Sequence, residues 1–363
     1  MRFPAVPRHY WLQNIHTRPS PALPREAGEG AEQTGEANES TKVKSMDSSV
    51  PTLITQADPV ELIGGTLTQL NRIILGKERQ MRLCIACLLA RGHLLIEDIP
   101  GVGKTTLAHA LAETLGLSYQ RVQFTSDLLP ADIIGVSVFE RETSEFRFHK
   151  GPVFSQLVLA DEVNRATPKA QSALLEAMEE HQVTVDGHTY PLAAPFFVIA
   201  TQNPMYQIGT YPLPESQLDR FLLRIELGYP DAALERQLLL GQDRRDLLAT
   251  LSPTLSPQQL LLMQTMVPGM YASDALLDYV QAIVRYTREA PQFEAGLSPR
   301  AAIALLRAAQ AWTLIHGRTG VLPEDVQAVL PGVVGHRLKP RDEATALTAN
   351  QIGEMVLKAV DVP

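Results

Sequence analysis

The chain of 363 residues contains only two cysteines, Cys84 and Cys87. A C-x-x-C pair can be redox-active or can supply half of a zinc site. The sequence offers no second cysteine pair and no suitably spaced histidine pair to complete a metal set. The surrounding segment is apolar and lacks glycine and proline, so both thiols are predicted to pack inside a buried helix as small hydrophobes. Two reduced cysteines fit a cytoplasmic protein.

Long apolar runs and an excess of basic residues are also missing. No run of 18 apolar residues occurs, so the sequence predicts no membrane-spanning helix. The formal net charge of -8 argues against broad attraction to nucleic acid or anionic lipid, although it does not exclude a local basic patch. With 45% hydrophobic and 20% charged residues, the chain has the composition of a soluble globular protein long enough for two domains.

The first 45 residues differ from the rest, being rich in Pro, Gly and Glu and without apolar periodicity. Such a segment cannot bury enough apolar surface to offset its ordering entropy. It has no apolar core of a secretory signal. We expect residues 1–48 to be a disordered tail, and because Met46 opens a sequence of globular character, the tail could be a mis-assigned start.

A strand, a glycine-bearing turn and a helix follow one another between His93 and Leu115. Leu94-Leu95-Ile96 predicts a buried parallel strand, and Thr105–Leu115 predicts a helix. This is the phosphate-binding loop of P-loop NTPases, in which backbone N–H groups and a helix N-terminus converge on phosphate oxygens. The loop residues, expected to contact the nucleotide, are Asp98, Ile99, Pro100, Gly101, Val102, Gly103, Lys104, Thr105 and Thr106. Lys104 would reach the β- and γ-phosphates, and the Thr105 hydroxyl would ligate Mg²⁺.

One position departs from the general pattern G-x-x-x-x-G-K-[ST], which asks for glycine where this chain has Asp98. Aspartate is among the few non-glycine residues that tolerate left-handed backbone. For that reason the loop could still close with aspartate at this position.

Two carboxylates end the next strongly apolar run, Leu157-Val158-Leu159-Ala160-Asp161-Glu162. A buried strand would place both at its carboxyl end, the edge at which ligands bind in open α/β sheets. In this Walker B arrangement Asp161 would hold Mg²⁺, directly or through water, and Glu162 would polarise the attacking water. Taken alone, the pattern could also be a strand end with two solvated acids.

Other strands and two hairpins complete the first half of the chain. Strands are predicted at Tyr119–Phe124, Phe196–Thr201 and Leu222–Leu227, and hairpins at 136–149 and 183–190. Asn203 follows one of these strands, where an amide could hydrogen-bond the attacking water or a γ-phosphate, although Asn-Pro is often only a turn.

Past residue 230 the pattern turns helical. Helices are predicted at 231–242, 256–266, 273–288, 298–316, 323–330 and about 342–359. Ser298 is a good N-cap and Pro299 a good first residue, which places Arg300 in a first helical turn, where a cation opposes the helix dipole. The predicted fold is thus an α/β core over 49–229, with a parallel five-stranded sheet, helices on both faces and hairpin insertions, followed by an all-α lid domain over 230–363.

These motifs together resemble the MoxR-type AAA+ ATPases over residues 55–363. The resemblance rests on the loop at 98–105 and on the segments Gly151–Phe154, Leu159–Ala166, Gln171–Glu180, Ala200–Pro204, Pro212–Glu215, Leu218–Phe221 and Leu297–Arg300. It implies that Asn203 is sensor 1, which reads the γ-phosphate, and that Arg300 is sensor 2 on the lid. It also implies that Arg220 is an arginine finger that reaches a neighbouring subunit's ATP, whereas alone Arg220 would be read as a surface ion pair. The two hairpins match the helix-2 insert and the pre-sensor-1 hairpin, and in this family Asp at position 98 is not unusual.

The resemblance further implies an ATPase that converts ATP and water to ADP and phosphate. It implies a hexameric, chaperone-like protein that assembles or activates a client, often with a partner bearing a von Willebrand factor A domain. ATP and Mg²⁺ are the expected cofactors, and nucleic acid is not an expected partner.

Three alternatives use the same motifs. A nucleic-acid motor is disfavoured by the acidic balance and by the lack of a basic, aromatic-interleaved stretch. A magnesium-chelatase-type subunit is related in architecture. A non-hydrolysing nucleotide sensor is disfavoured by the presence of Glu162, Asn203 and Arg220.

Overall fold

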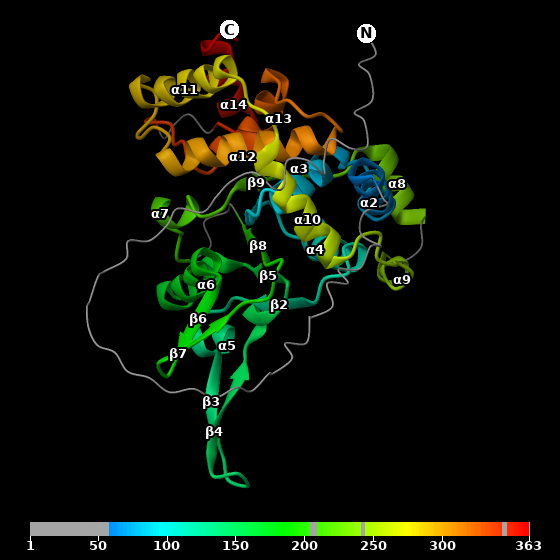
Figure 1. Cartoon of the computed structure of the whole chain (residues 1–363), viewed down its shortest axis with the longest axis vertical. Helices are drawn as coiled ribbons and strands as arrows, with labels where there is room; N and C mark the ends of the chain where they lie inside the picture. Colours follow the sequence, from blue (N-terminus) through cyan, green and yellow to red (C-terminus); the bar gives the residue numbers. More distant parts are fainter. Residues whose placement is uncertain (1–57, 204–208, 241–243, 343–346, 363) are drawn as a thin grey trace, which may run out of the picture. The chain divides into compact units, whose positions relative to one another are not determined.

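The computed structural model describes residues 58–203, 209–240, 244–342 and 347–362 (Figure 1). The predicted tail over residues 1–48 lies outside these ranges. Among the described residues, no helix is both long enough and apolar enough to span a bilayer.

A five-stranded parallel sheet forms the centre of the first half of the chain, as predicted. Its strands are β1 (Leu94–Glu97), β2 (Tyr119–Gln123), β5 (Leu157–Asp161), β8 (Phe197–Gln202) and β9 (Leu223–Ile225). They pair in the order β2-β5-β8-β1-β9, so the strand followed by the glycine-bearing loop lies between two strands that come much later in the sequence. All five residues of β5 are buried, which explains why the strand reads as a continuous apolar run rather than an alternating one.

Strand β9 is shorter than the predicted segment Leu222–Leu227. The backbone N–H groups of Leu227 and Gly228 donate to the carboxylate of Asp98 instead of pairing with a neighbouring strand. A side chain from the loop after β1 therefore ends the last strand.

Helices and two hairpins surround this sheet. The helices of this half are α2 (Pro59–Ile73), α3 (Glu78–Leu89), α4 (Lys104–Thr114), α5 (Pro130–Ile134), α6 (Pro168–Glu180) and α7 (Glu215–Leu218). The hairpins are β3 (Gly135–Glu140) with β4 (Glu145–Lys150), and β6 (Gln182–Val185) with β7 (His188–Pro191), both antiparallel as predicted. One face of the sheet packs with α6 in a core that includes Val158, Ala160, Val198 and Leu174, and α4 contacts β5.

Both cysteines lie in α3 and are fully buried and free. Burial raises the pKa of each thiol well above its ordinary value. The described residues hold no cluster of three or more His, Cys, Asp or Glu side chains that could bind a metal ion. The prediction that the pair packs as small hydrophobes is confirmed.

The described residues after 230 contain helices and no extended strand, as predicted. These helices are α8 (Ala232–Leu240), α9 (Arg244–Leu248), α10 (Pro257–Met266), α11 (Asp274–Glu289), α12 (Pro299–Ile315), α13 (Pro323–Val334) and α14 (Ala349–Ala359). Helix α12 contacts α13 and also α3, so a helix from the second half of the chain packs against one that precedes β1 (Figure 1). A division at residue 230 stays a prediction.

Two predicted helix boundaries were wrong. The helix expected to stop at residue 330 continues through Pro331 to Val334, because residues 329–334 are all buried and packing outweighs the missing proline N–H. The helix expected from about 342 begins at Ala349, where Thr348 and Gln351 form a reciprocal N-terminal cap, and residues 343–346 lie outside the described ranges. Helix α9 was not predicted.

Candidate active site

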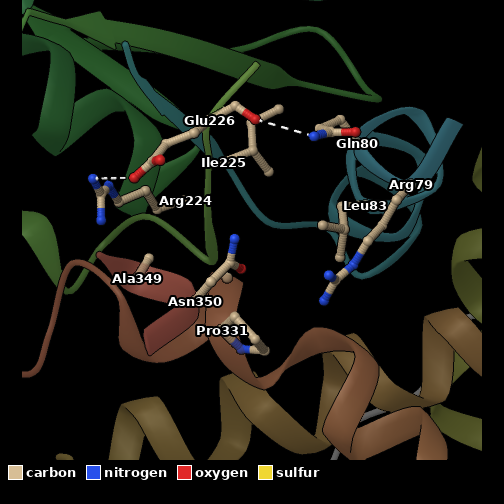
Figure 2. Close-up of a pocket in the computed structure, with 10 residues that line it drawn as sticks. Arg79, Gln80, Leu83, Arg224, Ile225, Glu226, Pro331, Ala349 and Asn350 are labelled. Atoms are coloured by element: carbon tan, nitrogen blue, oxygen red, sulfur yellow. Dashed lines mark hydrogen bonds and ion pairs between the residues drawn. The ribbon is translucent and has the colours of Figure 1, made fainter. Parts of the chain in front are cut away.

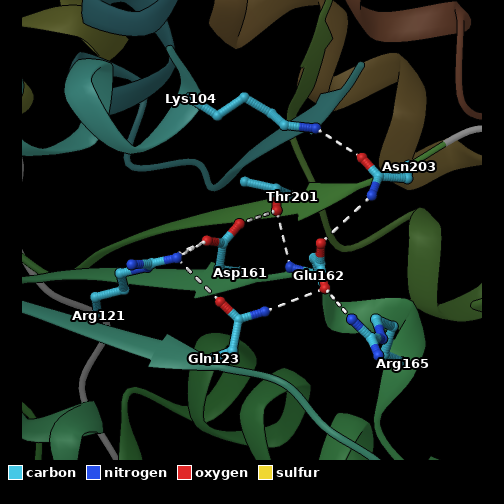
Figure 3. A network of polar contacts seen from close by, with 8 residues as sticks. All are labelled: Lys104, Arg121, Gln123, Asp161, Glu162, Arg165, Thr201 and Asn203. Carbon is cyan, nitrogen blue, oxygen red and sulfur yellow. Dashed lines mark hydrogen bonds and ion pairs between the residues drawn. The ribbon is translucent and has the colours of Figure 1, made fainter. Parts of the chain in front are cut away.

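The predicted site residues of the core meet where β1, β5 and β8 end (Figure 3). The loop of residues 98–103 leads from β1 into α4, whose first residue is Lys104. Asp161 ends β5, Glu162 follows it, and Asn203 follows β8. Since parallel strands end at one edge, residues about 100 positions apart in the chain become neighbours.

The loop bends through two glycines in left-handed backbone, Gly101 (φ 84°) and Gly103 (φ 94°). A side chain at either position would be strained, since L-residues other than glycine seldom adopt such φ values. Gly103 is the N-cap of α4, so the free N–H groups of the helix's first turn open onto the loop. The first turn also holds Thr105 and Thr106. A turn of this kind at a helix N-terminus is suited to bind an anion such as phosphate.

Asp98 is not in left-handed backbone, so the predicted reason for its tolerance was wrong. Its carboxylate is buried and accepts three backbone hydrogen bonds. Oδ1 accepts from Ile99 N at 2.8 Å, and Oδ2 accepts from Leu227 N and Gly228 N at 2.5 and 2.7 Å. Aspartate therefore ties the phosphate-binding loop to the segment that follows β9.

Lys104 is buried, and its ammonium donates to three oxygens. These are the carbonyl oxygens of Asp98 and Gln202 and, at 3.1 Å, Oδ1 of Asn203. Desolvation lowers the pKa of Lys104, and the nearby carboxylates of Asp98, Asp161 and Glu162 oppose that shift. A desolvated cation in a phosphate-binding loop interacts strongly with an incoming anion because little water screens it.

The Thr201 hydroxyl binds both Asp161, the last residue of β5, and the backbone of Glu162, which follows it. Thr201 Oγ1 donates to Asp161 Oδ1 at 2.6 Å and accepts from the backbone N–H of Glu162 at 2.8 Å. Arg121, on β2, pairs with the other oxygen of Asp161 at 2.6 Å. Glu162 itself has left-handed backbone (φ 57°), which turns its side chain away from the direction of the strand. Strain at a residue of this kind is typical of functional sites.

The carboxylate of Glu162 accepts from three side chains (Figure 3). Oε2 accepts from Arg165 at 2.8 Å and from Gln123 at 3.2 Å, and Oε1 accepts from Asn203 at 3.4 Å. Because Asn203 also accepts from Lys104, its amide connects the lysine to the glutamate. The predicted phosphate sensor, phosphate-binding lysine and water activator therefore form one hydrogen-bonded chain.

The donor set fits a magnesium ion. The Thr105 hydroxyl and the Asp161 carboxylate would supply hard oxygen ligands from α4 and β5, two elements in contact. Mg²⁺ prefers such oxygens, keeps several waters, and in nucleotide sites takes only one or two protein ligands beside phosphate oxygens.

The two predicted arginines lie together at a different place, at the C-terminal end of α6. Arg220 Nη1 lies 2.6 Å from Glu179 Oε2 and donates to the Leu175 carbonyl at 2.8 Å. Arg300, in the first turn of α12, lies 2.6 Å from Glu179 Oε1. Among the described contacts, neither arginine reaches the phosphate-binding loop of its own chain.

Five residues that complete these arrangements were not singled out from the sequence: Arg121, Gln123, Arg165, Thr201 and Glu179. Strand β2 pairs with β5 so that Gln123 lies opposite Asp161. The alternation of Arg121 and Gln123 could have identified them only if the strand order had been known.

Away from these residues, a small hollow lies between α3, β9, α13 and α14. It is lined by Arg79, Arg224, Glu226 and Asn350 among others (Figure 2). It has room for about 70 Å³. Pockets for small ligands are usually in the range of about 300–1,000 Å³, so this hollow is too small for a nucleotide.

Comparison with known proteins agrees with this geometry. Residues 93–223 match the family model described as "ATPase family associated with various cellular activities (AAA)", and residues 285–355 match the AAA lid domain. The chain is 46% identical to the uncharacterized protein YeaC of Bacillus subtilis, over 85% of this chain and 97% of YeaC. It is 38% identical to Chaperone MoxR1 of Mycobacterium tuberculosis, over 85% of this chain and 84% of that protein.

A third relative, Protein MoxR of Paracoccus denitrificans, is 34% identical over 76% of this chain and 89% of its own length. A crystal structure from Cytophaga hutchinsonii, described provisionally as an ATPase, superposes with a TM-score of 0.76 at 36% identity. That match covers 84% of this chain and 96% of the other.

Proposed function

The chain belongs to the MoxR family of AAA+ ATPases, and we propose that it binds ATP with Mg²⁺ and hydrolyses the ATP to ADP and phosphate within a ring of identical subunits. The observation that carries this proposal is the hydrogen-bonded chain of Lys104, Asn203 and Glu162. It joins a phosphate-binding cation to a carboxylate that can activate water.

Binding begins with the loop and Lys104. The N–H groups of the loop and of the first turn of α4 donate to the phosphate oxygens, and Lys104 exchanges its bond to Asn203 for bonds to phosphate oxygens. Thr105 and Asp161 would hold Mg²⁺, which when bound neutralises charge on the phosphates. Thr201 fixes the Asp161 carboxylate for this task.

Hydrolysis needs Glu162 to turn from its present donors toward a water. In this structure Gln123, Arg165 and Asn203 occupy its two oxygens. When the γ-phosphate draws Lys104 and Asn203 toward itself, one oxygen of Glu162 becomes free to accept a proton from the water. Asn203 then reports the presence of the γ-phosphate to the carboxylate.

Arg220 acts on the nucleotide of the neighbouring subunit, as the resemblance implies, and we propose the same direction of action for Arg300, the predicted sensor 2. They lie beside each other on Glu179, and their described contacts include none with their own loop. A positive group supplied in trans stabilises the charge of phosphoryl transfer and contributes about 10³–10⁵ in rate. Hydrolysis then depends on assembly of the ring, which we expect to be hexameric.

The work done by hydrolysis is the remodelling of another protein. One relative carries the name Chaperone MoxR1. We propose that this chain likewise assembles or activates a client in the cytoplasm, together with a partner that bears a von Willebrand factor A domain.

Phosphate release and nucleotide binding test the reaction. Lys104→Ala should lose nucleotide binding, whereas Glu162→Gln should bind ATP and hydrolyse it at least about 10²-fold more slowly. Glu113→Gln, the same change at an exposed site on α4, is the matched control and should keep native turnover. Native turnover in Glu162→Gln would contradict its role.

A capture experiment tests the partner. Glu162→Gln with ATP should retain a von Willebrand A-domain protein that Lys104→Ala does not retain. An identical set of captured proteins in both variants would contradict nucleotide-dependent recruitment.

A further inference from the structure

Glu179 binds two guanidinium groups with one carboxylate. Its Oε2 pairs with Arg220 and its Oε1 with Arg300, each at 2.6 Å. The two arginines come from different parts of the chain, since Arg220 follows α7 and Arg300 opens α12 (Figure 1). The width of one carboxylate therefore sets the separation between a cation of the core and a cation of the helices that follow it.

The two arginines depend on Glu179 to different degrees. Arg220 has a second anchor, the Leu175 carbonyl at 2.8 Å. Its neighbour Asp219 is also fixed, because the buried Arg337 of the segment after α13 pairs with it at 2.7 Å. Arg300 is about half exposed, and Glu179 is its one partner among the described contacts. Ser298, the N-cap of α12, donates to Asp219 at 2.9 Å and so places the start of α12 beside Arg220. Glu179 then holds the guanidinium group of Arg300 itself next to that of Arg220.

Electrostatic repulsion also makes the position of Arg300 depend on Glu179. Arg300 lies in the first turn of a helix, where a positive charge opposes the dipole, and it lies beside another cation. Without a carboxylate between them, both effects would drive Arg300 away into water. Glu179 offsets the repulsion between the two guanidinium groups, so the three side chains together keep one net positive charge.

A hollow with room for about 470 Å³ opens beside Arg220 and Glu179, lined also by Ser172, Glu176, Gln182 and Gln217. Its size lies within the range of about 300–1,000 Å³ that is usual for sites of small ligands. Arg220 and Glu179 contribute to the wall of this hollow, so the Arg220 member of the pair has an open space beside it.

We propose that Glu179 is a positioning residue of the active site shared between subunits: it holds Arg220 and Arg300 of one subunit as a pair directed at the ATP of its neighbour. This inference rests on the proposed function. It assigns Glu179 no contact with ATP. Its task is to present two charges together, so that the helices after residue 230 and the core deliver them as one unit.

The test uses the isosteric substitution Glu179→Gln in the full chain. The amide can accept from one arginine but turns its NH₂ group toward the other. Turnover per subunit should fall roughly 10- to 100-fold, as for a misplaced catalytic group, while nucleotide affinity of each subunit stays within about twofold because the loop is untouched. Glu113→Gln, the same change at an exposed site on α4, is the matched control and should hydrolyse ATP at the native rate.

Three further measurements separate positioning from a general loss of structure. Mixing Glu179→Gln with Lys104→Ala should restore turnover, because the second subunit supplies an intact pair of arginines to the first subunit's nucleotide. The double variant Glu179→Gln/Arg300→Ala should be within about twofold of Arg300→Ala alone, since Arg220 keeps its anchor on the Leu175 carbonyl and the effect that Glu179 exerts through Arg300 is already lost. Glu179→Asp, which keeps the charge but shortens the side chain, should fall between native and Gln.

Three outcomes would overturn the inference. Native turnover in Glu179→Gln, beside an inactive Arg220→Ala, would show that the pair needs no carboxylate. Suppose that mixing with Lys104→Ala restores the turnover of Arg220→Ala but does not restore that of Glu179→Gln. Glu179 would then act on the nucleotide site of its own subunit. Failure of mixing for Arg220→Ala as well would refute the shared site itself, and the inference would fall with the proposed function.

Discussion

Replacing Asp98 by glycine restores the general P-loop pattern, and we expect it to damage the protein. The substitution Asp98→Gly removes a buried carboxylate that accepts from the N–H groups of Ile99, Leu227 and Gly228. The last two bonds join the loop after β1 to the segment after β9. Their donors would lie buried or half-buried with no acceptor in place of the carboxylate.

The magnitude follows from those two long-range bonds. A hydrogen bond to a charged acceptor contributes about 1.5–3 kcal/mol, so the pair sets an upper limit of about 6 kcal/mol. Relief of the desolvation of a buried carboxylate offsets part of this sum, and the added backbone freedom of glycine costs about 0.5–1 kcal/mol. We expect a net loss of about 2–4 kcal/mol in the free energy of unfolding.

Urea unfolding at pH 7, followed by circular dichroism, measures the loss. Asp98→Asn is the matched control, because it keeps the shape and one acceptor oxygen, and it should lose about half as much as the glycine variant. Weaker nucleotide binding should accompany the loss, since Lys104 donates to the Asp98 carbonyl and the loop would no longer be held. Native stability with native or tighter ATP binding in Asp98→Gly would refute the reasoning.

Two other changes should give equally definite results. Thr201→Val removes the hydroxyl shared by Asp161 and the Glu162 N–H. We expect turnover to fall and the free energy of unfolding to drop by about 1–3 kcal/mol. Unchanged phosphate release and an unchanged urea midpoint would count against this role of Thr201. Burial lowers the pKa of His93 to about 4, from an ordinary 6.5, so only the unfolded chain takes up this proton between those values. The stability that His93 contributes is therefore complete above about pH 6.5 and declines toward pH 4 by as much as about 1.4 kcal/mol per pH unit, which urea melts at pH 7 and pH 5 would detect as a steeper decline than in His93→Asn.

The local motifs of the site could be predicted from the sequence because each combines a strand end with the residues next to it. The loop after β1 contains Gly101 and Gly103 and leads into Lys104. Asp161 ends β5, and Glu162 follows it. A chain that leaves a buried strand must present its next side chains at the edge of the sheet. No knowledge of the neighbouring strands is needed for that conclusion.

The partners of those residues depended on the strand order, which the sequence does not contain. Thr201 can bridge Asp161 and Glu162 only because β8 pairs with β5, and Arg121 reaches Asp161 only because β2 is on the other side of β5. Glu179 meets Arg300 across 121 positions of sequence. Each of these contacts joins polar side chains whose own segments give no periodic signal.

Asp98 shows a further limit of reasoning from the sequence. The residue was expected to replace glycine by tolerating left-handed backbone, yet it makes contacts that glycine cannot make. The donors are the N–H groups of Leu227 and Gly228, which lie 129 and 130 positions further along the chain. A local rule for the backbone therefore gave the wrong reason for a residue whose role is long-range.

The central claim is that one active site is built from two subunits, and mixing Arg220→Ala with Lys104→Ala tests it most directly. Each variant alone should be inactive, the first for want of a charge in trans and the second for want of nucleotide. In an equal mixture about one interface in four joins an intact loop to an intact arginine, so turnover should return to roughly a quarter of the native value in a closed ring of identical subunits. A mixture as inactive as both parents would contradict the claim.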